Sequence, residues 1–99
     1  MTKTMLAYET IKNTNFNSDY DAIELQLMPI VDAKVSDEEL VDAIKGLFED
    51  LQYKRNMTKE RLEFFIYDLN DINYILFDGQ NKRLKEFEID LGMIVDSMK

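Results

Sequence analysis

This 99-residue chain has few side chains suited to catalysis, because it contains no histidine and no cysteine. Histidine is the usual group for proton transfer near neutral pH, and cysteine is a common nucleophile. Its three glycines are isolated, so the sequence has no phosphate-binding glycine loop. We therefore expect a non-enzymatic protein that needs no cofactor.

Carboxylates remain as candidate ligands for hard cations such as Ca²⁺. The run that begins at Asp68 has the first spacings of a calcium loop. Position five of this run is Ile72, position six is Asn73 instead of glycine, and position twelve is Gly79 instead of glutamate. The sequence therefore predicts no metal site.

The carboxylates are concentrated in one third of the chain. Residues 19–50 contain ten carboxylates and two lysines, so this segment alone has a net charge equal to the formal −8 of the whole chain. A concentrated negative field attracts basic surfaces and repels nucleic acid and anionic membranes. We expect a protein partner with a basic surface, and neither direct nucleic-acid binding nor membrane binding. The residues expected to contact it form an acidic face: Asp19, Asp21, Glu24, Glu38, Asp42, Glu49 and Asp50.

The spacing of these carboxylates suggests a more specific function. Glu38, Asp42 and Glu49 fall on one side of a predicted helix, away from its apolar stripe. Carboxylates three or four residues apart on a helix are about 5–6 Å from each other, close to the spacing of phosphates along a nucleic-acid strand. The most concrete hypothesis is a phage or mobile-element type inhibitor, a nucleic-acid mimic that occupies the basic groove of a nucleic-acid-handling or defence enzyme. The plainer alternative is an acidic surface that serves only solubility.

Aromatic residues offer a second candidate surface. The segment 58–77 carries aromatic side chains outside its main apolar stripe, which is more apolar surface than a lone surface helix needs. Such a helix is either central to a bundle or in contact with another chain. The alternative function is thus a helical structural subunit, oligomerisation subunit or adaptor, with a homodimer allowed, that binds through Phe64, Tyr67, Tyr74 and Phe77.

Three helices are predicted to position these residues, over 36–54, 58–78 and 82–98. In the first, apolar residues recur every three or four positions, Ser36 and Glu39 match a capping box, and Val35 and Leu40 match a hydrophobic staple. The second begins at Thr58, and Gly79 can end it in a left-handed conformation. The third keeps its register despite the internal Gly92.

Two regions give mixed signals. Residues 18–31 fit a helix capped by Ser18, but Pro29 predicts an end near residue 26 or 27 and an extended segment after it. Residues 1–17 predict either a weak helix near 4–12 or a loosely ordered N-terminal segment. In addition, residues 62–91 contain β-favouring residues, a hairpin signal at Asp78-Gly79 and a strictly alternating run.

The predicted fold is an all-α bundle of three to four helices in a single domain that spans residues 1–99. The alternative is an α+β fold in which helix 36–54 packs on a small antiparallel sheet. No apolar run approaches the roughly 20 residues that span a bilayer, the start lacks the apolar core of a signal peptide, and cysteine is absent. We therefore expect a cytoplasmic protein.

Overall fold

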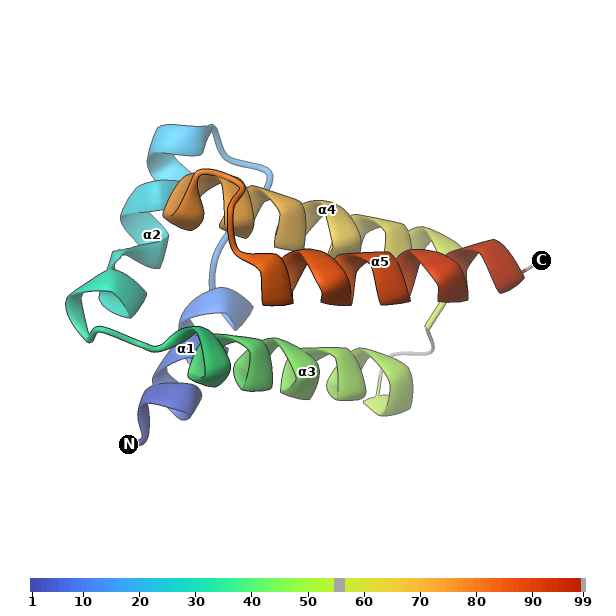
Figure 1. The fold of residues 1–99 in the computed structure, drawn as a ribbon, viewed down its shortest axis with the longest axis horizontal. Helices are drawn as coiled ribbons and strands as arrows, with labels where there is room; N and C mark the ends of the chain where they lie inside the picture. The colour runs from blue at the N-terminus through green and yellow to red at the C-terminus, as the bar shows by residue number, and fades with distance from the viewer. Residues whose placement is uncertain (55–56, 99) are drawn as a thin grey trace. The chain divides into compact units, whose positions relative to one another are not determined.

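The computed structural model describes residues 1–54 and 57–98, and these residues form five α-helices (Figure 1). The helices are α1 (Lys3–Lys12), α2 (Tyr20–Asp32), α3 (Asp37–Lys54), α4 (Lys59–Phe77) and α5 (Lys82–Ser97). The predicted helical class is confirmed, but the predicted number of three to four helices is too low. In this part of the chain no residue belongs to a strand, so the alternative with a sheet is wrong.

The contacts between Cα atoms divide the chain into two compact units, Met1–Leu51 and Gln52–Lys99, with the boundary in the last turn of α3. Whether the chain behaves as the single domain expected from its length stays a prediction.

In the first unit, α1 packs against α2. The apolar residues of these two helices that face the interior are buried: Ala7, Ile11, Ile23, Leu27 and Ile30. The sequence left open a weak helix or a loosely ordered segment over residues 1–17. The structure has a helix at Lys3–Lys12, and Thr2 caps it by accepting a hydrogen bond from the Met5 amide.

Helix α2 continues through Pro29, so the expectation that it ends near residue 26 or 27 is wrong. Proline removes the hydrogen bond from its own nitrogen to the carbonyl four residues earlier, here that of Leu25. Pro29 and Leu25 both lie on the exposed side of α2, where water can take over that bond. The last turn then closes normally, because the Ala33 amide donates to the Pro29 carbonyl over 3.0 Å.

Helix α3 begins with the predicted capping box. The Glu39 amide donates to the Ser36 hydroxyl over 3.1 Å, and the Ser36 amide donates back to the Glu39 carboxylate over 2.9 Å. The hydrogen bond from the Ser36 backbone holds the pKa of Glu39 below its usual value. Both bonds satisfy amides that the first turn of a helix leaves without partners, which explains why this boundary is predictable from sequence.

The second unit contains α4 and α5, which pack side by side (Figure 1). Thr58 caps α4, as predicted, by accepting a hydrogen bond from the Arg61 amide. The Asp78-Gly79 pair does not form a β-hairpin. Both residues adopt left-handed conformations, with φ of 55° and 78°, and the Gly79 amide bonds back to the Asn73 carbonyl, so the pair ends α4.

A pair of asparagines connects α4 to α5. Asn73 and Asn81 are only 2% and 5% exposed. The Asn81 amide donates to Asn73 Oδ1 over 3.0 Å, Asn73 Nδ2 donates to the Asn81 carbonyl over 3.3 Å, and Asn81 Oδ1 caps α5 by accepting from the Leu84 amide. These bonds fix the start of α5 against the last turns of α4.

Candidate protein-binding surfaces

Three residues of the predicted acidic face lie along one exposed stripe of α3. Glu38, Asp42 and Glu49 are all exposed, and the exposed Lys45 lies between the last two. Their intervals of four and seven residues place them on one side of the helix, so the stripe extends over about three turns. The apolar residues of the opposite side, Leu40 and Ile44 among them, are buried. A rigid helix therefore presents these carboxylates at fixed spacing.

The predicted residues around α2 have different roles. Asp21 and Glu24 are exposed on the first turns of the helix. Asp19 is the helix cap, because its carboxylate accepts a hydrogen bond from the Ala22 amide over 2.9 Å. The prediction that Ser18 caps this helix is wrong. Asp19 remains exposed, but part of its hydrogen-bonding capacity already stabilises α2.

Asp50 is half-buried and accepts a hydrogen bond from the Tyr8 hydroxyl of α1. The Tyr8 ring lies beside α3, since a Cβ placed on Gly46 would be 3.6 Å from a ring carbon. The Lys12 ammonium is 5.7 Å from the centre of the same ring, within the range of a cation–π contact. Asp50 thus helps to join α1 to α3, a role that spacing alone did not reveal.

The two units differ sharply in charge. The first unit contains eleven carboxylates and four lysines, a net charge of −7, whereas the second contains nine carboxylates and eight basic residues, a net charge of −1. The segment 19–50 that dominates the charge of the sequence therefore belongs to one compact unit. All seven predicted acidic contact residues lie in it.

The alternative aromatic surface lies on α4. Phe64, Tyr67 and Tyr74 are exposed, and their spacing places them on one side of the helix. Phe77 differs, because it is half-buried at the last residue of α4. Three of the four predicted aromatic residues therefore form one exposed stripe.

Sequence reasoning missed an apolar surface on α2. Tyr20 and Val31 continue the three- and four-residue spacing of the buried Ile23, Leu27 and Ile30, but both side chains are exposed. Leu25 and Met28 are exposed as well. These residues share a face only if the helix continues through Pro29, so the expected end before the proline prevented its prediction.

The pKa of the Asp68 carboxyl on α4 is well above its usual value. Burial and the neighbouring charge of Asp71 raise the pKa of Asp68 to about 6. Burial also raises the pKa of Glu88, against the opposing effects of a hydrogen bond from Asn73 and the charge of Lys85. A perturbed pKa alone is a weak sign of catalysis, because burial in a structural position has the same effect.

The described residues include no cluster of three or more carboxylates arranged to hold a metal ion. Nor does any helix in residues 1–54 and 57–98 combine the length and apolar character that crossing a bilayer requires. The chain matches no protein-family model, no curated protein and no solved structure.

Proposed function

We propose that this chain is a non-enzymatic binding protein whose acidic first unit docks on a basic surface of a partner protein. The observation that carries the proposal is the exposed stripe of Glu38, Asp42 and Glu49 on α3, within a unit of net charge −7. Fixed charges of one sign steer an oppositely charged partner toward the surface and select against partners of like charge.

The most concrete form of this proposal is an inhibitor of a nucleic-acid-handling or defence enzyme, of the kind that phages and mobile elements use. The groove that binds nucleic acid in such an enzyme is lined by lysine and arginine side chains that contact phosphates. A helix with carboxylates at regular intervals can occupy that groove and exclude the substrate. Free DNA or RNA should then compete with the protein for the enzyme.

The test compares two variants of equal charge change. Asp42→Lys with Glu49→Lys reverses the stripe on α3, and Asp90→Lys with Asp96→Lys changes two exposed carboxylates of α5 by the same amount. In affinity capture from a lysate of the source cells, the α3 variant should lose its partner, the α5 variant should retain it, and high salt should weaken capture. Equal capture by both variants, with circular dichroism unchanged, would show that the α3 stripe is not the binding surface.

A second candidate function rests on the exposed aromatic stripe of α4. Phe64 and Tyr67 are both exposed, and exposed aromatic clusters are typical of protein interfaces. This surface would support a structural or adaptor role, including a homodimer. Association through it should persist at high salt and should be lost with Phe64→Ser and Tyr67→Ser, so sedimentation at low and high salt separates the two functions.

A further inference from the structure

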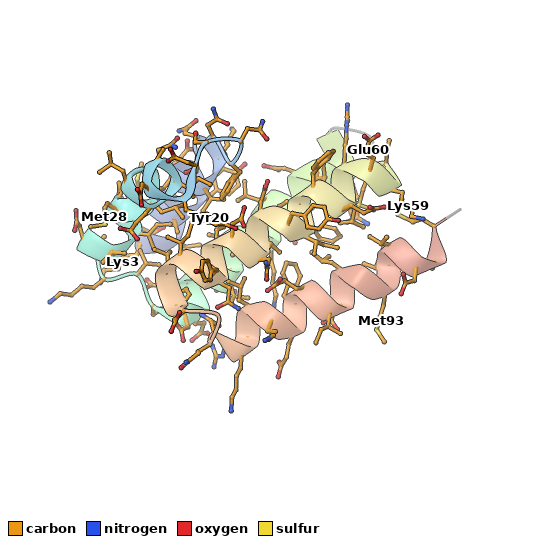
Figure 2. The ribbon with its side chains drawn as sticks, turned by 90° about the horizontal axis from the view of Figure 1, so that it is seen from above. Lys3, Tyr20, Met28, Lys59, Glu60 and Met93 are labelled. Atoms are coloured by element: carbon orange, nitrogen blue, oxygen red, sulfur yellow. The ribbon has the colours of Figure 1, made fainter. Side chains whose placement is uncertain are left out.

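The exposed side of α2 combines apolar and acidic side chains. Leu25 is 74% exposed, Val31 50% and Met28 39%, and Figure 2 labels Met28 together with Tyr20 from the first turn of the same helix. Apolar side chains exposed singly are ordinary, but these follow one another along one side of a 13-residue helix. The opposite side carries the buried Ile23, Leu27 and Ile30.

Carboxylates alternate with these apolar residues. Asp21, Glu24 and Asp32 are exposed on the same side of α2, and residues 20–32 contain no lysine or arginine. On a helix, Glu24 lies one turn before Met28, and Asp21 lies one turn before Leu25. A partner that covers this face would therefore meet apolar and negative groups side by side.

The backbone adds an acceptor to the same region. Pro29 has no amide hydrogen, so the Leu25 carbonyl lacks its usual helical donor. Leu25 and Pro29 are both exposed residues, so a partner that covers this side of α2 comes close to this carbonyl. A lysine or arginine of a partner can donate to it, whereas a carboxylate cannot.

We propose that this face of α2 binds a basic amphipathic helix of the partner protein, one whose apolar side contacts Leu25, Met28 and Val31 and whose lysines or arginines pair with Asp21, Glu24 and Asp32. This inference rests on the proposed function and names the kind of surface that the partner offers. Burial of apolar side chains supplies affinity, and the flanking charges fix orientation and choice of partner.

Charge complementarity selects this occupant over the others. A second copy of the chain would bring together two units of net charge −7, and an anionic membrane would repel the same carboxylates. A phosphate mimic that acts by charge alone has no use for the exposed Leu25 and Met28. A cationic helix with one apolar side complements both the exposed apolar side chains and the carboxylates of α2.

The experiment uses two labelled probes and the full chain. One probe is a Leu/Lys peptide patterned as an amphipathic helix of about four turns, and the other is an oligolysine of the same charge. The test variant is Leu25→Ala with Met28→Ala, which removes apolar area and keeps a good helix former. The matched control is Ile89→Ala with Met93→Ala, an exposed apolar pair on α5.

We expect the Leu/Lys peptide to bind at least about tenfold more tightly than oligolysine, because burial of two apolar side chains exceeds the free energy that a tenfold change in affinity requires. The Leu25/Met28 variant should lose about tenfold in affinity for the Leu/Lys peptide, and the α5 control should change by less than about twofold. Fluorescence anisotropy gives the affinities, and circular dichroism checks that each variant is folded.

Equal binding of the two probes, or equal loss from the α2 and α5 variants, would overturn the inference about α2 and leave the basic-partner function standing. Failure of both probes to bind at low salt would overturn the proposed function itself.

Discussion

Asn73 is a polar residue in a position that the helical pattern assigns to the apolar stripe of α4. Its side chain is buried, and both its oxygen and its nitrogen bond to the backbone of Asn81. A buried side-chain amide that bonds to a neighbouring backbone specifies one alignment of the two segments, because only that alignment allows both hydrogen bonds. An apolar side chain at the same position would tolerate several alignments. Asn73 therefore determines where α5 begins relative to α4.

Replacement of Asn73 by alanine should lower the free energy of unfolding by about 1–3 kcal/mol, because it leaves the buried Asn81 amide without a partner. The Asn81 carbonyl loses one of its two donors and keeps the Lys85 amide. Urea unfolding followed by circular dichroism measures the change. The control is Asn70→Ala, at an exposed position of the same helix, which should change stability by no more than about 0.5 kcal/mol. Equal losses from the two variants would contradict the role given to Asn73.

At the scale of elements, the ends of helices are predictable where side chains cap them. Ser36 with Glu39 and Thr58 mark the starts of α3 and α4 in the sequence, and the structure has the corresponding hydrogen bonds. Pro29 misleads because proline predicts a break, although an exposed position near the end of a helix tolerates the lost bond. The Asp78-Gly79 pair misleads because the same two residues suit a hairpin turn and a left-handed helix end.

Of the candidate surfaces, too, some were predictable from the sequence and others were not. The acidic stripe on α3 was predictable because the apolar repeat and the capping box define a helix, and a helix fixes which residues share a side. The apolar side of α2 was not, since its recognition requires knowing that the helix includes residues 28–32. The bond between Tyr8 and Asp50 joins residues 42 positions apart, and no local pattern indicates such a contact.

The capping box of α3 gives a prediction at this scale. Ser36→Ala removes the acceptor for the Glu39 amide and should lower the free energy of unfolding by about 1 kcal/mol. Ser97→Ala, which removes an exposed hydroxyl bonded to the Ile94 carbonyl at the end of α5, serves as the comparison. Thermal or urea unfolding of both variants tests the difference, and a Ser36→Ala protein as stable as the wild type would show that the box contributes nothing.

At the scale of the whole molecule, the two units contain acidic groups with opposite pKa shifts. Asp68 and Glu88, whose pKa values are raised by burial, lie in the second unit, and Glu39, whose pKa is lowered, lies in the first. A group with a raised pKa binds its proton more tightly in the folded protein, so its ionisation opposes folding. As the pH falls, proton binding to Asp68 and Glu88 therefore favours folding of the second unit, whereas proton binding to Glu39 opposes folding of the first.

The variant Asp68→Asn tests how the raised pKa of Asp68 affects stability. Between about pH 4 and 6 the folded protein keeps a proton on Asp68 that the unfolded chain releases, so the contribution of Asp68 to stability falls as the pH rises through this window. At pH 7 the variant should be more stable than the wild type by about 1 kcal/mol, a value reduced to allow for the screening of a half-buried group by water. The advantage should disappear near pH 4.

Urea unfolding at several pH values measures both proteins, and Asp96→Asn, at an exposed position of α5, controls for the loss of one carboxylate. An advantage of Asp68→Asn that stays constant from pH 7 to 4 would mean that the stability change does not come from proton binding.

The exposed methionines are natural probes for oxidative footprinting of the surface. Met5, Met28 and Met93 lie on α1, α2 and α5, and each thioether that solvent reaches is open to conversion into a sulfoxide by mild peroxide. A ligand seated on α2 would shield Met28 from the oxidant and leave Met93 reactive, whereas one seated on α5 would reverse the order. A mass spectrum of the oxidised protein thus records which helix was covered, with no label added to the chain.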